Sequence, residues 1–205
     1  MDIFEAVYTL RAMRRLKPDP VDEKLIWKVL DAAIRAPSGG NRQPWKFIVL
    51  TDDEKKGKIG EWYLDGWNNS YGKMKDRFLA DPAGARMYGS ADHLANHIRE
   101  VPVLIFPCVD NGGVAAVSGA GANIFPAVQN LMLAARALGL GTTLTTLHRT
   151  HDAEVKELLG IPDRYDALAM IPMGWPVGKF GTGPRRPIEE VTYWDSWKST
   201  KHQEE

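Results

Sequence analysis

A short run of arginines near the N-terminus is the first part of the sequence with the chemistry of a binding site. Arg11, Arg14 and Arg15 follow a predicted amphipathic helix over residues 2–10. Guanidinium groups form paired hydrogen bonds with phosphate oxygens, so the run suits a phosphorylated ligand. The same run is also typical of a solvated cationic helix end, where positive charge complements the helix dipole. Taken alone, it leaves both interpretations open.

A second polar segment, residues 36–45, joins a predicted helix to a predicted strand and reads Ala-Pro-Ser-Gly-Gly-Asn-Arg-Gln-Pro-Trp. Its hydroxyl and side-chain amides are polar groups of the kind that bind a heterocycle. Gly39 and Gly40 would let the backbone approach a planar ligand closely. A simple glycine turn is the alternative for this segment alone.

Together the two segments resemble the nitroreductase family of FMN-dependent oxidoreductases. The family signature Ala-Pro-Ser-x-x-Asn-x-Gln-Pro-Trp is matched at every specified position over residues 36–45, and Phe-Ile-Val-Leu follows it. The resemblance continues with Ala-Leu-Gly-Leu-Gly at 137–141, Met-Gly-Trp-Pro at 173–176 and Arg-Arg-Pro at 185–187. It therefore covers essentially the whole chain and is weakest between residues 55 and 90.

Two details refine this resemblance. Gly-Thr-Thr-Leu-Thr-Thr at 141–146 is similar to the subgroup that contains the flavin-dependent dehalogenases. The family's first signature, Arg-Ser-x-Arg, is represented by residues 11–14, where Ala12 replaces the usual serine. One hydroxyl contact to phosphate is thereby lost, and FMN binding is expected to survive if Arg11, Arg14 and Arg185 share the phosphate charge.

The resemblance implies an FMN site shared between two copies of the chain in a homodimer. Arg11, Arg14 and either Arg185 or Arg186 are expected around the FMN phosphate and ribityl chain. The turn at residues 37–43 is expected to reach the flavin from the partner subunit, with Gln43 supporting the turn. The predicted cofactor-binding residues are Arg11, Ala12, Met13, Arg14, Pro37, Ser38, Gly39, Asn41, Gln43, Leu144, Thr145, Thr146, Arg185 and Arg186.

The implied activity is a ping-pong transfer of reducing equivalents from NAD(P)H through FMN to an electron-poor small molecule, such as a nitroaromatic or a quinone. A flavin takes hydride itself, so no protein nucleophile or acid–base pair is obligatory. Thr145 and Thr146 are both candidates for contact with the N5 and O4 edge of the flavin. Reductive dehalogenation, other FMN chemistry on the same fold, and a non-catalytic flavin-binding protein are the alternatives.

The histidines do not predict a metal site. His93 and His97 are four residues apart on a predicted helix, but no third ligand is evident nearby. His148 and His151 have no evident carboxylate partner in the sequence. We therefore expect no metal.

Secondary structure is predicted from periodicity, capping residues and turn residues. Prolines 102 and 107 in one apolar strand suggest that this strand lies at a sheet edge or carries a bulge. The predicted helices are 22–35, 90–100, 123–138 and 152–159, and the predicted strands are 45–50, 101–109, 142–146 and 167–175.

Two stretches lack this regularity. Residues 61–90 carry scattered aromatic side chains and predict a long, partly helical excursion, which either covers the flavin as a lid or packs against the body or the dimer partner. Residues 177–205 predict a C-terminal arm whose rings cannot bury themselves and which wraps the partner subunit.

Composition limits the remaining possibilities. With 26 basic and 26 acidic residues among 205, the chain has no overall positive charge to attract nucleic acid or an anionic membrane. One cysteine, Cys108, and the absence of a signal-like N-terminus favour a cytoplasmic protein. We expect a single domain over residues 1–205, of α+β class, with a mixed, mostly antiparallel sheet flanked by helices.

Overall fold

An antiparallel sheet forms the centre of the molecule in the computed structural model, which describes residues 1–112 and 119–200. The main strand order is β1-β2-β5-β3, and β4 pairs with β2 beside β5. Every strand pairing among the described residues is antiparallel, which confirms the α+β class. The strands are β1 (Trp45–Leu50), β2 (Val103–Asp110), β3 (Gly141–Thr142), β4 (Tyr165–Ala167) and β5 (Ile171–Gly174).

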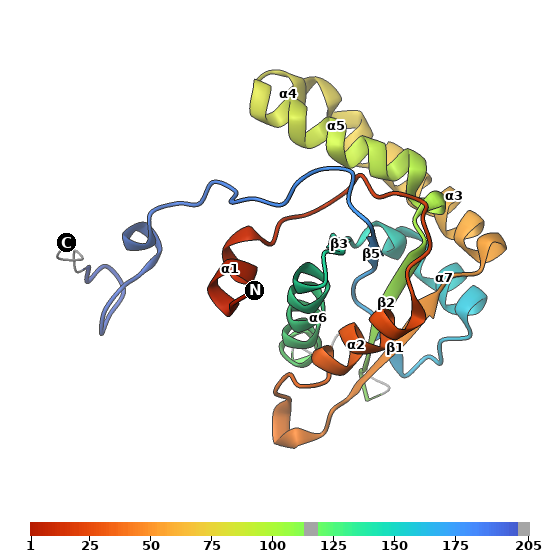
Figure 1. The fold of residues 1–205 in the computed structure, drawn as a ribbon, viewed down its shortest axis with the longest axis horizontal. Coiled ribbons are helices and arrows are strands. Elements are labelled where there is room, and N and C mark those ends of the chain that lie inside the picture. Colours follow the sequence, from red (N-terminus) through yellow and green to blue (C-terminus); the bar gives the residue numbers. More distant parts are fainter. Residues whose placement is uncertain (113–118, 201–205) are drawn as a thin grey trace.

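Helices cover both faces of this sheet (Figure 1). Their starts follow local chemistry: the Asp22 and Asp52 side chains accept hydrogen bonds from the first turns of α2 and α3. Gly160, at φ +65°, ends α7 in the left-handed conformation. The helices are α1 (Ile3–Thr9), α2 (Glu23–Ala33), α3 (Asp53–Asn69), α4 (Lys75–Leu79), α5 (Pro82–His97), α6 (Ala120–Ala137) and α7 (Asp152–Leu159).

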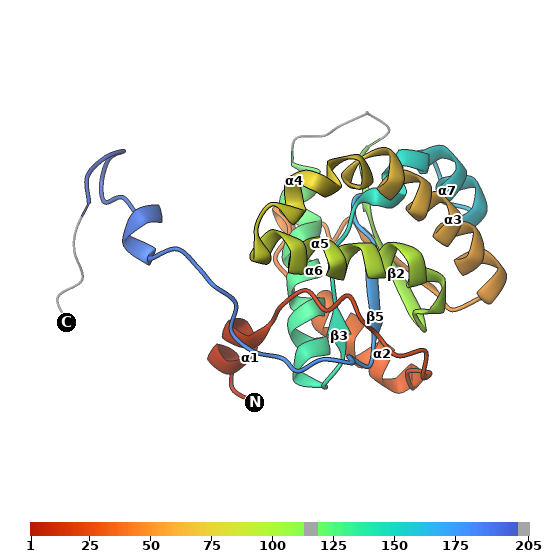
Figure 2. The same ribbon diagram turned by 90° about the horizontal axis from the view of Figure 1, so that it is seen from above.

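The core is divided between the two faces by the alternation of side chains along β2. Val103 and Ile105 join the buried cluster under α2 and α6, whereas Leu104 and Phe106 join the cluster under α3, α5 and α7. Figure 2 shows α6 on one side of the central strands and α3 with α7 on the other. This arrangement is why β2 is apolar at nearly every position.

The edge position predicted for this strand is wrong. β2 pairs with β1 along one side and with β5 and β4 along the other. Pro102 precedes the strand, and Pro107 falls between residues 103–105, which pair with β5, and residues 108–110, which pair with β4. A proline lacks an N–H, and here it occupies the step between two partners, so a central strand accommodates it.

Three other expectations need adjustment. The strand predicted over 167–175 is two strands, β4 and β5, separated by a bridge in which Met170 and Thr145 exchange backbone hydrogen bonds. The strand predicted over 142–146 shrinks to β3 for the same reason. The excursion at 61–90 is almost entirely helical, because its first third continues α3 and its last third begins α5.

Residues 177–180 still contact the body, where Val177 N donates to Arg15 O and the Arg136 guanidinium lies over the Phe180 ring, and the chain that follows extends away from it (Figures 1 and 2). This arm contains a short 3-10 helix, Ile188–Val191, and no β-strand among its described residues. Residues 201–205 of the predicted arm lie outside the described residues. Within the described part of the chain, no helix is both long enough and apolar enough to cross a membrane.

Candidate active site

An aromatic-walled cavity of about 390 Å³, called here the aromatic cavity, lies between α3, α5 and the segment that follows β3. One wall comes from the predicted excursion and the other from the Thr-Thr-Leu-Thr-Thr run, and Arg14 also lines the cavity. The sequence singled out both stretches for different reasons, and the structure brings them together. The lining residues are Arg14, Tyr63, Trp67, Tyr71, Phe78, Met87, Tyr88, Ala91, Leu94, Thr143, Leu144, Thr145, Thr146 and Leu147.

Tyr63 was not singled out as a functional residue, yet it makes a side-chain hydrogen bond that joins the two walls of this cavity. Its hydroxyl lies 2.9 Å from Thr145 Oγ1. Burial raises the pKa of the phenol, while the hydrogen bond to Thr145 and the Arg14 guanidinium oppose that rise. The helical spacing Ile59, Tyr63, Trp67 was the available signal, since these three side chains are buried on one face of α3.

A second, smaller cavity of about 270 Å³, called here the cationic cavity, is lined by the whole arginine run. Lys179 adds a further positive charge from the chain that follows β5. Arg14 lines both cavities, so positive charge and an aromatic-walled space adjoin each other. The lining residues are Arg11, Ala12, Met13, Arg14, Arg15, Ser90, Gly178 and Lys179.

Backbone contacts hold the arginine run in place. Met13 N donates to Thr142 O at 2.8 Å, and Met13 is buried. A Cβ added at Gly141 would lie 2.8 Å from Met13 Cβ, so the glycine permits this close approach. Further along, Val177 N donates to Arg15 O at 3.0 Å. The backbone that carries the arginines is therefore held in place by hydrogen bonds to β3 and to the segment after β5.

Burial acts on Arg14 more than on its neighbours in the run. It is partly buried, whereas Arg11 and Arg15 are exposed. This burial lowers the pKa of the guanidinium from its ordinary value, although arginine stays charged at neutral pH. Arg14 is thus a partly desolvated cation at the junction of the two cavities.

The turn at residues 37–43 is also well ordered by its own contacts. The Ser38 hydroxyl accepts from Gln43 N at 3.0 Å, and Gln43 Nε2 donates to Asn41 Oδ1 at 3.1 Å. Gly39 N donates to Asn123 Oδ1 of α6 at 2.8 Å. Gly40, Asn41 and Gln43 have φ between 51° and 59°, a left-handed conformation that costs energy outside glycine.

This turn does not reach either cavity of its own chain. Its residues line neither one, and Figure 1 shows the orange loop between α2 and β1 far from the red segment that follows α1. Arg185 and Arg186 also line neither cavity. They lie on the extended arm, where the Arg185 guanidinium donates to the adjacent Pro184 carbonyl. Within one chain, Lys179 rather than either of these arginines lines the cationic cavity.

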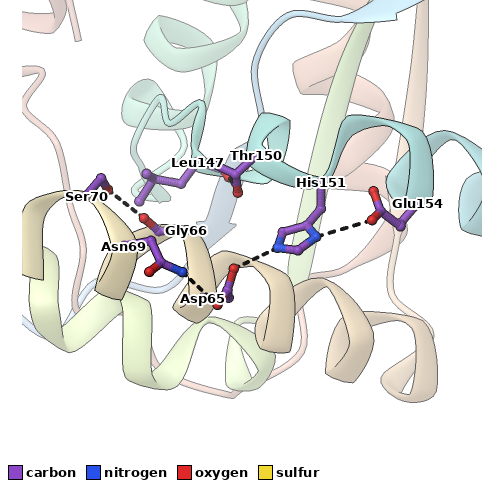
Figure 3. A network of polar contacts seen from close by, with 8 residues as sticks. All are labelled: Asp65, Gly66, Asn69, Ser70, Leu147, Thr150, His151 and Glu154. Carbon is purple, nitrogen blue, oxygen red and sulfur yellow. Dashed lines mark hydrogen bonds and ion pairs between the residues drawn. The ribbon is translucent and has the colours of Figure 1, made fainter.

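The histidines divide into two cases. His151 contacts Asp65 at 2.9 Å and Glu154 at 3.5 Å (Figure 3), so the expectation that it lacks carboxylate partners is wrong. The hydrogen bond to Asp65 raises its pKa above the ordinary value. His148 is fully buried against Phe106, and burial lowers its pKa to about 4. Among the described residues, no cluster of three metal-binding side chains is found.

Comparison with known proteins agrees with this geometry. The sequence pattern of the Nitroreductase family matches residues 9–175. A protein of Methanothermobacter thermautotrophicus, named for NADH dehydrogenase and NAD(P)H nitroreductase, is 30% identical over 89% of this chain and 81% of its own length. An NADH dehydrogenase of Thermus thermophilus is 26% identical over 95% of this chain and 96% of its own.

Solved structures extend the agreement to the fold. A crystal structure of iodotyrosine deiodinase with FMN and 3-iodo-L-tyrosine superimposes with a TM-score of 0.75 at 21% identity, covering 96% of this chain and all of the other. A BluB-like flavoprotein of Clostridium difficile gives a TM-score of 0.74 at 20% identity, covering 96% of this chain and all of the other. The chain belongs to the nitroreductase family of oxidoreductases, and the resemblance seen in the sequence is confirmed.

Proposed function

We propose that this protein is an FMN-dependent oxidoreductase that takes electrons from NAD(P)H and passes them, in a ping-pong cycle, to an electron-poor small molecule. The observation that carries the proposal is the position of Arg14, which lines both the cationic cavity and the aromatic cavity. FMN matches this pair of adjoining cavities, since it carries a phosphate at one end and a planar ring at the other.

The residues present fit FMN. Arg11, Arg14 and Lys179 supply the positive charges for the phosphate, and the backbone beside Ala12 supplies donors where the family serine is missing. The aromatic cavity provides a largely apolar space for the ring. Leu144, Thr145 and Thr146 are the candidates along its polar edge. No other cofactor is needed to account for these side chains.

When bound, FMN supplies hydride acceptance and electron storage, which no side chain can provide. The side chains of the protein would bind FMN, orient its ring and adjust its reduction potential. Arg14 places a partly buried positive charge where negative charge on the reduced cofactor would be stabilised. The aromatic walls formed by Tyr63, Trp67 and Tyr88 would surround the bound ring with largely apolar side chains and limit the access of water to it.

The homodimer is part of this proposal. The turn at residues 37–43 carries the family signature but lies away from both cavities of its own chain, so it is expected to serve the cofactor of the partner. Apolar side chains of α1 also remain exposed in one chain, as is typical of a surface that a partner subunit covers. These are Ile3, Phe4, Val7 and Tyr8, whose exposed fractions run from 46% to 65%.

The arm gives the dimer a second contact. Its exposed Ile188, Val191 and Trp197 cannot be buried by the arm itself. An apolar groove of about 790 Å³ runs between α2 and the edge strand β1 and is lined by Trp27, Ile34 and other apolar side chains. We propose that the arm of the partner occupies this groove, because the groove offers both apolar surface and an unpaired strand edge.

The aromatic cavity also bears on the acceptor. Arg14 is the only charged side chain among its lining residues. A zwitterionic amino acid such as iodotyrosine would leave its ammonium group without a carboxylate there. A planar acceptor without positive charge, such as a nitroaromatic or a quinone, therefore fits better than the ligand seen in the deiodinase structure.

The test is anaerobic reduction of the purified protein with FMN bound. We expect a yellow dimer whose flavin absorbance is bleached by NADH or NADPH and restored by a nitroaromatic or a quinone, but not by iodotyrosine. Flavin that neither nicotinamide reduces would contradict the proposed electron donor. A protein that binds no FMN at all would contradict the whole assignment.

A further inference from the structure

Arg136 is a charged side chain that the fold buries outside both cavities. It lies in the last turn of α6 and is 9% exposed, and it lines neither the aromatic cavity nor the cationic cavity. The negative end of the α6 dipole favours a cation at this position. A buried guanidinium still loses hydration, which its contacts in the folded protein must replace. What Arg136 contacts therefore indicates its role.

Arg136 contacts two segments that are far apart in the sequence. Its Nε donates to Thr9 Oγ1 at 3.0 Å, and its guanidinium carbon lies 4.0 Å from the centre of the Phe180 ring. The Thr9 hydroxyl in turn donates to Glu5 O at 2.6 Å, so this hydroxyl is oriented from both sides. One buried arginine thus connects α6 to the end of α1 and to the start of the arm.

These two segments are the ones that form the cationic cavity. Arg11 lies two residues after Thr9, and Lys179 directly precedes Phe180. Both Arg11 and Lys179 line the cationic cavity. Arg136 therefore holds a neighbour of each of these two cations, and it does so from outside the cavity.

On the side of the arginine run, the contact with Thr9 is one of two anchors. The other anchor is the bond from Met13 N to Thr142 O of β3 at 2.8 Å. Arg11 lies between the two anchors, and it is exposed. A long exposed side chain loses conformational freedom when it binds a ligand. Fixing the backbone on both sides of Arg11 removes the part of that entropic cost that the main chain would otherwise add.

The segment after β5 is held in the same way. Before Lys179, Val177 N donates to Arg15 O at 3.0 Å, and after Lys179 the Phe180 ring contacts Arg136. The ring is half-buried, whereas Lys179 itself is exposed. Without the contact between Phe180 and Arg136, the stretch that carries Lys179 would lose one of these two anchors.

We propose that Arg136 is a positioning residue for the phosphate of bound FMN, because it holds the segments of Arg11 and Lys179 in place before the cofactor binds. This inference rests on the proposed function, in which the cationic cavity takes the phosphate. Preorganised cations bind a phosphate more tightly than cations that must first be ordered. The gain applies to the phosphate end of the cofactor alone. Riboflavin, which has the same ring and no phosphate, should not benefit from it.

The test measures the ratio of the dissociation constants for riboflavin and FMN by calorimetric titration. This ratio isolates the phosphate, because the two ligands share the same ring. Phe180→Leu and Thr9→Val each remove one contact of Arg136 and leave every charge in place. An arginine–ring contact or a neutral hydrogen bond is worth about two- to fivefold, so each variant should lower the ratio by about that factor. The affinity for riboflavin should stay at the wild-type value.

A double-variant cycle tests whether the effect runs through Arg136. Arg136→Met removes both contacts and should lower the ratio about 5- to 25-fold if the two contacts add. Because this substitution also removes a positive charge, the cycle carries the argument rather than the single value. In the Arg136→Met background, Phe180→Leu should change the ratio less than about twofold, since its partner is already absent. Phe180→Leu and Thr9→Val carry the test if Arg136→Met fails to fold.

Tyr165→Leu is the matched control. Tyr165 lies on β4, where its ring takes part in another arginine–ring contact, with Arg164 at 5.6 Å. It lines neither the aromatic cavity nor the cationic cavity. This substitution should lower the temperature of thermal unfolding and leave the ratio unchanged.

The outcomes separate the two levels of the argument. A wild-type protein that binds no FMN would overturn the proposed function together with this inference. If the wild type binds FMN and the variants lose affinity for riboflavin and FMN equally, Arg136 has a structural role only, and this inference alone is wrong. The same conclusion follows if Phe180→Leu and Thr9→Val both keep the wild-type ratio, or if Phe180→Leu lowers the ratio equally with and without Arg136.

Discussion

The two signature segments of this chain differ in how complete they are within one protomer. The arginine run is attached to β3 through Met13, and it lines a cavity together with Lys179 of the same chain. The turn at residues 37–43 is just as well ordered, through Ser38 and Asn123, yet it lines neither candidate cavity of its own chain. Because the turn is well ordered but lines neither cavity of its own chain, we propose that it serves the cofactor of another copy of the chain.

Removing the arm is the most severe test of this difference between the arginine run and the turn at residues 37–43. A chain ending at Pro187 lacks the apolar residues from Ile188 onward but keeps Lys179, Arg185 and Arg186. We expect the dimer to be lost, as measured by light scattering. FMN binding should weaken by at least about 100-fold, because the turn at 37–43 would no longer reach the cofactor of the partner subunit. A truncated protein that stays dimeric would show that the arm is not the main contact.

Arg14→Ala should produce the next largest effect, on the half of the site that one chain completes. A charge-assisted hydrogen bond is worth about 1.5–3 kcal/mol, so FMN affinity should fall about 10- to 150-fold in a fluorescence titration. Arg35→Ala is the control, since Arg35 is exposed just after α2 and forms an ion pair with Asp31. The dimer should survive both substitutions. Equal FMN affinity in the two variants would argue against the cationic cavity.

The contrast between Lys179 and Arg185 shows what a sequence can and cannot predict. The fixed residue types of residues 36–45 identified the family, and the strand Trp45–Leu50 was predicted with its correct bounds because turn residues flank it. Arg185 matched the family pattern as well, but its neighbours in space depend on where the arm lies. Lys179 carried no pattern of its own, and only the path of the chain after β5 brings it to Arg14.

Tyr63 was missed for a different physical reason. Gly57, Gly60 and Gly66 interrupt the apolar stripe of α3 and hid its helical period. The structure shows that Gly60 and Gly66 lie where α3 touches neighbouring segments closely. Likewise, Pro107 suggested an edge strand because the sequence does not show that β2 changes partner at that residue. Such errors arise where a local preference yields to tertiary packing.

Matched substitutions of Lys179 and Arg185 can show which of these two cations contributes more to FMN binding. Lys179→Ala should weaken FMN binding about tenfold, since the ammonium lies beside Arg11 and Arg14 in the cationic cavity of the same chain. Arg185→Ala, measured in the same titration, reports whether the arm brings its own charge to a phosphate in the dimer. A larger loss from Arg185→Ala than from Lys179→Ala would place the phosphate nearer the arm than the geometry of one chain indicates.

The contact between Asp65 of α3 and His151 of the 3-10 helix Leu147–His151 should give the smallest effect, and its sign follows from the pKa of His151. The hydrogen bond to Asp65 raises this pKa above the ordinary value of 6.5. The folded protein therefore holds the proton more tightly than the unfolded chain, so this contribution to stability is present in full below about pH 6.5 and is lost as the pH rises through the folded-state pKa. His151→Gln should thus destabilise the protein more at pH 5.5 than at pH 8.

His148 acts in the opposite direction and must be separated from His151. Its pKa is lowered to about 4, so the unfolded chain takes up a proton that the folded protein refuses, and wild-type stability should fall as the pH drops from about 6.5 toward 4. The difference between wild type and His151→Gln, measured by thermal unfolding at each pH, cancels this shared slope. If that difference is the same at pH 5.5 and pH 8, then Asp65 does not hold His151 in its charged form, and the attachment of α3 to the Thr145 segment rests on the close packing at Gly66 alone.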